Sequence, residues 1–236
     1  SEKGEQTQLF YGVELETDGY DDTEEAFNRL YTIDPRERLF WQAEDSSLNN
    51  GIEIITTPCT LQYHRESFPW PKIVNTVRDN GGRSYDTDTC GLHIHFSRAV
   101  YQDSNLEEDD YALLRLLFLV ECFWDKLVTF SRRTPSELSS WAHRYKTSVN
   151  DGDITQARRI KNYESSHYTC VNFENKDTIE VRIFKGSLNI QTILASIELV
   201  DLLIHLSLHC QLNTIRKMTW TKITDRATPK RYPSLH

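Results

Sequence analysis

Two common phosphate-binding motifs are missing from this 236-residue sequence. It contains no G-x-x-x-x-G-K-[ST] loop and no G-x-G-x-x-G run, the glycine-rich turns that cradle phosphates in many nucleotide-binding proteins. If the protein binds a nucleotide, it must therefore do so by another arrangement, through metal ions and a sheet.

The sequence also has too few positive charges for a typical nucleic-acid-binding surface. Lys and Arg number 27 against 35 Asp and Glu, which gives a formal net charge of −8. Domains that bind nucleic acid usually carry a strongly basic face. The composition therefore argues against nucleic acid as the main partner.

Neither a membrane span nor a disulfide framework is expected. The longest apolar run, Leu113 to Val120, contains Arg115 and is far too short to cross a bilayer. Residues 1–8 look like a polar, frayed tail and not like a signal peptide. The cysteines are odd in number and scattered, with no C-x-x-C pair: Cys59, Cys90, Cys122, Cys170 and Cys210. We expect reduced thiols, which predicts a cytoplasmic protein.

The chain is long enough to bury a substantial core, and a single domain over residues 9–212 is the default interpretation. Helix and strand patterns are intermixed without regular βαβ alternation, which predicts an α+β fold with a largely antiparallel sheet. The expected strands are 9–17, 38–44, 52–56, 91–97, 168–174 and 178–184, and the expected helices are 22–31, 70–80, 105–130 and 190–212. Residues 131–156 lack a strong pattern, as functional loops often do, and residues 213–236 are expected to pack loosely as a tail.

One predicted strand carries ionisable side chains opposite an apolar face. Successive side chains of Thr178–Phe184 alternate between the two faces of a sheet, so its β-branched residues suit a core. Glu180 and Arg182 then lie beside each other on the opposite face. Taken alone, this pattern is more typical of a surface ion pair than of a site.

The same design recurs on three more predicted strands. The ionisable residues that alternate with apolar ones there are Glu14, Glu16, Glu53, His93 and His95. Asp45 lies in the turn-rich segment at the base of the hairpin that leads to Glu53. Each pattern alone has a structural explanation, and their repetition on four strands is what indicates a functional face.

Such a face suits hard metal ions. Closely spaced carboxylates repel each other unless a cation lies between them, and oxygen ligands with an imidazole favour Mg²⁺ or Mn²⁺ over zinc. Two such ions would clamp a triphosphate. Arg182, with Arg132 or Arg133, could then neutralise a phosphoryl group during its transfer.

Four segments together resemble the amidoligase family: Gly12–Glu16, Asp45–Glu53, Cys90–Phe96 and Thr178–Asn189, in that family's order. This family belongs to the carboxylate–amine ligases related to glutamine synthetase and glutamate–cysteine ligase. The resemblance covers roughly residues 9–210. It implies a curved, largely antiparallel sheet of the glutamine synthetase-like type, with long helices on its convex side. The concave side would hold ATP with Mg²⁺ or Mn²⁺ ions.

The resemblance also implies roles for individual residues. The ligands of one metal would be Glu16, Asp45 and Glu53. The ligands of the other would be Glu14, His93 and Glu180. The residues expected to act on phosphate or on the acyl acceptor are His95, Arg182, Arg132 and Arg133. The residues expected to contact ATP, directly or through its metals, are Glu14, Glu16, Arg182 and Lys185.

The implied reaction is ATP-driven amide formation through an acyl phosphate. The substrates would be a small-molecule or peptide carboxylate and an amine, with neither nucleic acid nor a membrane as partner, and the resemblance leaves the oligomeric state open. Two alternatives remain. One is another ATP-dependent phosphotransferase on a similar sheet, such as a guanidino kinase. The other is a catalytically inactive domain that binds metal or a partner.

Overall fold

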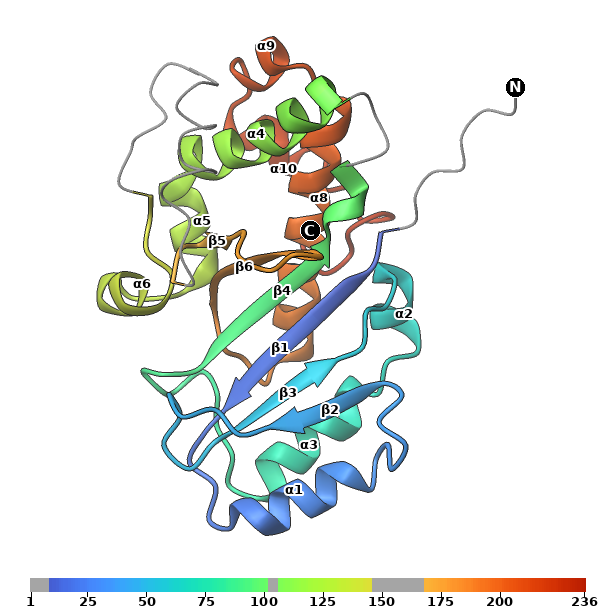
Figure 1. Ribbon diagram of the computed structural model, residues 1–236, viewed down its shortest axis with the longest axis vertical. Helices are drawn as coiled ribbons and strands as arrows, with labels where there is room; N and C mark the ends of the chain where they lie inside the picture. Colours follow the sequence, from blue (N-terminus) through green and yellow to red (C-terminus); the bar gives the residue numbers. More distant parts are fainter. Residues whose placement is uncertain (1–8, 102–105, 146–167) are drawn as a thin grey trace.

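The computed structural model describes residues 9–101, 106–145 and 168–236, and the backbone alone for residues 106–111. Its strands form one sheet in the order β2-β3-β1-β4-β6-β5 (Figure 1). Every neighbouring pair is antiparallel. The strands are β1 (Tyr11–Thr17), β2 (Phe40–Ala43), β3 (Ile52–Thr56), β4 (Gly91–Ser97), β5 (Val171–Asn172) and β6 (Thr178–Lys185). The predicted α+β class with an antiparallel sheet is confirmed.

The helices gather at both ends of the molecule. The described helical segments are α1 (Thr23–Tyr31), α2 (Leu61–Glu66), α3 (Trp70–Asp79), η1 (Arg98–Tyr101), α4 (Leu106–Cys122), α5 (Trp124–Ser131), α6 (Pro135–Trp141), α8 (Ile190–His209), α9 (Leu212–Ile215) and α10 (Trp220–Thr224). Helices α1 and α3 pack together beyond β2 and β3, while α4, α9 and α10 lie at the opposite end (Figure 1). Asp22 caps α1, where its side chain accepts a hydrogen bond from the Glu25 N–H.

One face of the sheet is apolar and α8 covers it. Val13, Leu15 and Ile94 are fully buried on this face, and the Tyr11 hydroxyl donates a 2.6 Å hydrogen bond to Asp201 of α8. By length and composition α8 could cross a membrane, but 78% of its most apolar window is buried inside the protein. It is the central helix of the core.

A bulge in β6 alters the simple alternation of its side chains. Leu92 lies opposite Phe184 whereas Ile94 lies opposite Val181, so β6 contains one more residue than β4 in this stretch. Strict alternation would have placed Phe184 on the ionisable face with Arg182. The extra residue instead lets both Ile183 and Phe184 enter the core.

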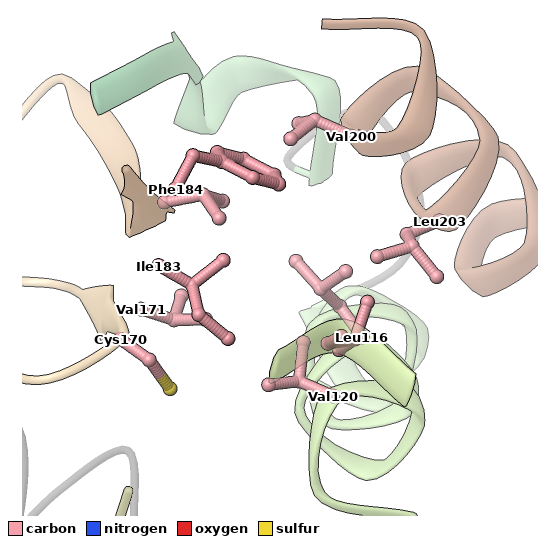
Figure 2. A pocket seen from close by; sticks show the side chains of 10 residues that line it. Leu116, Val120, Cys170, Val171, Ile183, Phe184, Val200 and Leu203 are labelled. Atoms are coloured by element: carbon pink, nitrogen blue, oxygen red, sulfur yellow. The ribbon is translucent and has the colours of Figure 1, made fainter. Parts of the chain in front are cut away.

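The core behind this bulge contains a small apolar cavity of about 20 Å³. Figure 2 draws the side chains that line it and labels the following, from α4, β6, α8, β5 and the residue before β5: Leu116, Val120, Cys170, Val171, Ile183, Phe184, Val200 and Leu203. A cavity of this size without polar lining is expected to stay dry. It is a packing defect of about one methyl group and not a ligand site.

The single long helix predicted for residues 105–130 is wrong, because the structure breaks it at Phe123. The backbone of Phe123 leaves the helical region, with φ −107° and ψ 21°. Its ring packs against Trp220 of the C-terminal segment at 5.8 Å between centroids, whereas Phe130 of α5 packs against Phe184 of β6. Two different packing partners thus require two helix directions, which helical periodicity cannot reveal.

Residues 131–145 are more regular than predicted. They contain α6, whose start is a capping box: Thr134 accepts from the Glu137 N–H, and the Glu137 carboxylate accepts from the Thr134 N–H. The sequence Thr134-Pro135-Ser136-Glu137 carries this signal, and our sequence analysis overlooked it. The short helix α2 was overlooked as well. The rest of the predicted loop, residues 146–156, lies outside the described residues.

The expectation that residues 213–236 pack loosely is also wrong. Ile215, Ile223 and Tyr232 are buried in this segment. The Tyr232 hydroxyl donates to Asp201 at 2.6 Å, and two backbone N–H groups donate to Glu198. Acidic side chains of α8 therefore hold the C-terminal segment against the core. Residues 1–8, predicted to be a flexible tail, lie outside the described residues.

Candidate active site

The strand register brings the ionisable side chains of the sheet together on the face opposite α8. Glu14 of β1 lies opposite His93 of β4, and Glu16 lies opposite Glu53 of β3. On the other side of β4, His95 lies opposite Glu180 of β6. Directly opposed side chains in an antiparallel pair are close neighbours, so four strands contribute to one site.

The first group of possible metal ligands contains Glu14, His93 and Glu180. Ligand atoms of all three lie within 4.8 Å of one another. His93 Nδ1 is 3.2 Å from a Glu14 carboxylate oxygen and 3.4 Å from a Glu180 carboxylate oxygen. This is the set that the sequence analysis assigned to one metal.

The second group contains Glu16, Glu53 and again His93. His93 Nε2 lies 3.8 Å from a Glu16 oxygen. Nδ1 of the buried His93 imidazole therefore faces the first group of possible ligands, and Nε2 faces the second. Asp45, the predicted third ligand beside Glu16 and Glu53, lines the same cavity but is not within this group. Its carboxylate accepts from the Ser47 N–H at 2.8 Å, a contact within its own turn.

Two buried arginines face the acidic groups across a cavity of about 230 Å³. Arg182 Nη1 donates to Glu180 at 2.5 Å, and its Nε has no hydrogen-bond acceptor among the described residues. Arg133 Nε donates to the Phe184 carbonyl at 3.1 Å, while its Nη1 and Nη2 find no acceptor in the described part of the chain. Unpaired buried guanidinium groups are costly, and an anionic ligand would satisfy them.

Gly91 brings the backbone of β4 close to the side chains of Arg133 and His93. Its N–H donates to a Glu16 carboxylate oxygen. A Cβ atom at this position would come within 2.3 Å of Arg133 Nη2 and 2.6 Å of His93 Nε2. Only glycine therefore lets the backbone approach both side chains so closely.

The charges of the site are unevenly balanced. Burial opposes ionisation of Glu14, but the hydrogen bond with His93 and the positive charge of the nearby imidazoles of His93 and His95 outweigh it and lower the pKa of Glu14. For Glu53, burial and the negative charges of Glu14, Glu16 and Asp45 together raise the pKa to about 8. Glu53 thus has three acidic neighbours, and no ion pair joins it to a cation among the described residues.

The sequence that forms this sheet and site matches the model of one protein family. The family model described as "Putative amidoligase enzyme" matches residues 11–204, which contain every proposed ligand. The chain belongs to the amidoligase family.

Two further comparisons concern curated proteins and solved structures. No curated protein matches this amidoligase-family chain. Among solved structures, it is similar to the ligase complex described as "Crystal structure of the complex between Prokaryotic Ubiquitin-like Protein Pup and its Ligase PafA", with 11% identity and a TM-score of 0.40. The similarity covers 89% of this chain and 50% of that one, so the amidoligase chain spans about half the length of that structure.

The other residues predicted for the site of this amidoligase differ in how they are placed relative to the acidic centre. His95 Nε2 is 2.9 Å from Glu14 but is not aligned for a hydrogen bond to it. Lys185 pairs with Glu137 of α6 at 2.8 Å. Arg132 is exposed and does not line the cavity of Arg133. It ends α5 in the left-handed conformation, with φ 62°; it faces a neighbouring groove instead.

Five further residues line the cavity of the amidoligase and were not predicted: Ser46, Ser47, Thr89, Trp141 and Tyr168. Trp141 and Tyr168 pack edge to face, with centroids 6.2 Å apart. Ser46 and Ser47 adjoin Asp45 in the sequence, so the turn that contains it was the available signal. Trp141 and Tyr168 come from separate segments, and only their tertiary packing brings them to the site.

Proposed function

We propose that this chain is an ATP-dependent carboxylate–amine ligase on a sheet of the glutamine synthetase-like type. It would join a small-molecule or peptide carboxylate to an amine through an acyl phosphate. The observation that carries this proposal is the combination of two sets of carboxylates around His93 with two buried arginines whose N–H donors are partly without an acceptor among the described residues. Carboxylates suit the metal ions of a metal–triphosphate complex, and free guanidinium donors suit its phosphoryl oxygens.

The donor set fits Mg²⁺ or Mn²⁺. We assign Glu14, His93 and Glu180 to one ion, and Glu16 and Glu53 to the other, with Asp45 near enough to join through a small movement or a water molecule. Mostly oxygen ligands with a single imidazole are typical of these metals. When bound, the ions would neutralise the charge of the β- and γ-phosphates and align them for transfer.

The residues of the chain would then position two successive transfers. In the first, a carboxylate oxygen of the acid bonds to the γ-phosphorus while the bond from that phosphorus to ADP breaks. Arg182 and Arg133 would donate to the phosphoryl oxygens as negative charge shifts among them. In the second, the amine nitrogen bonds to the acyl carbon, phosphate leaves, and the amine loses a proton. His95, whose Nε2 lies 2.9 Å from a Glu14 carboxylate oxygen, is the residue we assign to contact phosphate or the incoming acceptor.

Lys185 has a supporting place in this proposal, whereas Arg132, which does not line the cavity, has none. Lys185 lies at the end of β6 and pairs with Glu137, and we assign its ammonium group to a contact with an incoming phosphate. We keep the cytoplasm as the expected compartment, because ATP is abundant there and the cysteines at all five positions are free thiols.

The test is an ATP turnover assay with a panel of acids and with hydroxylamine as the amine. We expect ADP, phosphate and a hydroxamate to form together, in the presence of Mg²⁺ or Mn²⁺ and only with the right acid. A phosphorylated product that does not depend on the amine would favour the phosphotransferase alternative. Absence of ADP with every acid and guanidino compound tested would favour an inactive binding domain.

A further inference from the structure

A basic groove lies beside the candidate active site. It is a surface hollow of about 440 Å³, and we name it the arginine groove because Arg78, Arg83 and Arg132 line it. All three arginines are exposed. Asp86 is the acidic residue among its described lining residues, so the groove has a net positive charge on a chain whose formal net charge is −8.

The start of α8 adds to this positive potential. Asn189 and Thr192 line the groove, and the Asn189 side chain accepts from the Thr192 N–H as the cap of this 20-residue helix. The N-terminal end of a long helix carries a partial positive charge that favours anions. The helix end acts together with the three guanidinium groups, which are the main feature of the groove.

The arginine groove connects to the active site through Tyr85 and Lys185. The guanidinium of Arg132 lies 5.7 Å from the centroid of the exposed Tyr85 ring, and the Lys185 ammonium lies 5.1 Å from it. Lys185 is in turn the residue opposite Gly91 in the sheet, and Gly91 touches the acidic centre. The two sites are also adjacent in the sequence: Arg133 lines the cavity, and the preceding residue, Arg132, lines the groove.

We infer that the arginine groove binds an acidic peptide segment that carries the reacting carboxylate into the neighbouring cavity. This inference rests on the proposed function, and it names the class of the acid substrate. The triphosphate would find its counter-charges inside the cavity, in the metals and in Arg133 and Arg182. The groove then offers a second set of cations for a second anionic group. A ligand with carboxylates on both sides of the Gly91–Lys185 pair has to be extended, which a peptide with several Asp or Glu side chains satisfies.

Binding of a fluorescent tetraglutamate peptide, followed by anisotropy without ATP, tests the inference directly. We expect Arg132→Asn and Arg78→Gln each to weaken binding about threefold, and the double variant about tenfold, as for exposed charge pairs. Asn also tolerates the left-handed backbone at position 132. Arg132→Lys should keep most of the binding, and ATP affinity in the presence of Mn²⁺ should not change in any of these variants.

A matched control is available in another basic hollow, lined by Lys217, Lys222 and Arg226. The Lys222→Gln, Arg226→Gln variant removes two charges there and should leave peptide affinity unchanged. Three outcomes overturn the inference: equal weakening by this control, no weakening by the groove variants, or a loss of ATP affinity in place of peptide affinity. The last outcome would make the groove part of the nucleotide site.

The two proposals fail in different ways. Peptide binding that depends on Arg132, without ADP formation under any condition, would refute the ligase and leave the groove assignment standing. Hydroxamate formation from an acid, with no binding of the tetraglutamate peptide, would refute the groove assignment and leave the ligase standing.

Discussion

At the scale of single residues, Gly91 determines how closely the backbone of β4 can approach the charged side chains. A methyl group there would overlap with Arg133 Nη2 and His93 Nε2. Gly12 is the natural comparison in the same sheet. A Cβ atom at Gly12 would meet the Cβ of His95 at 3.6 Å and a carbonyl oxygen at 3.8 Å, which is ordinary contact.

We therefore predict that Gly91→Ala abolishes metal binding, whereas Gly12→Ala retains it. The added methyl group must displace the guanidinium of Arg133 or the imidazole of His93, and both metal groups share that imidazole. Isothermal titration with Mn²⁺ measures the effect, and circular dichroism checks that both variants fold. Equal Mn²⁺ affinity in the two variants would show that His93 is not a shared ligand.

Arg182 supports a second prediction at this scale. The Arg182 guanidinium donates to Glu180 through Nη1, and its Nε has no acceptor among the described residues. A planar guanidinium can bind two oxygens of one phosphoryl group, which a lysine ammonium cannot. We expect Arg182→Lys to lower kcat on the order of a hundredfold, with much less change in ATP affinity, because the contact gains strength as charge develops in the transition state. A normal kcat would make Arg182 only a structural partner of Glu180.

At the scale of elements, the pairing of β1 with β3 places the carboxylates of Glu16 and Glu53 directly opposite each other. Like charges that lie directly opposite each other destabilise a strand pair. The site tolerates this cost because a cation between the strands would remove it. In the metal-free protein this repulsion should grow as pH rises towards and above the pKa of Glu53.

This pair gives a pH prediction with a definite sign. The pKa of Glu53 is raised from 4.5 to about 8 by burial and by its acidic neighbours, so the folded state holds this proton more tightly than the unfolded chain. The free energy of unfolding of the metal-free protein should accordingly fall as pH rises from about 4.5 through 8. In Glu53→Gln that fall should be smaller, as measured by urea unfolding at several pH values with EDTA. The exposed Glu44→Gln is the control and should behave like wild type; equal slopes in all three proteins would contradict the prediction.

At the scale of the whole molecule, α8 joins the sheet to the C-terminal segment. Asp201 accepts from Tyr11 of β1 and from Tyr232 near the C-terminus. Glu198, whose side chain is completely buried, accepts from Arg65 of α2 and from the N–H groups of Ser234 and Leu235. A buried carboxylate that loses such donors becomes strongly destabilising.

We predict that a chain ending at Leu212 does not fold, because it exposes the core and strips partners from both acids. The milder variant Tyr232→Phe should fold with a loss of about 1.5 to 3 kcal/mol in the free energy of unfolding, typical of a hydrogen bond to a charged group. Urea denaturation measures both. Lys230→Ala, in the same segment, should be neutral. A stable fold without residues 213–236 would show that Glu198 and Asp201 find other partners.

The sequence by itself determined the α+β class and the face pattern of four strands, because a period of two in side-chain direction is a local property of extended backbone. It therefore located Glu14, Glu16, Glu53, His93 and Glu180 on one face. Tertiary structure alone decided what depends on contacts between distant segments. It placed His93 within both groups of possible metal ligands and left Asp45 outside them. It also placed Arg133 in the cavity and Arg132 in the neighbouring groove. It also broke the helix at Phe123 and buried Tyr232, since the packing partners that cause these features are far away in the chain.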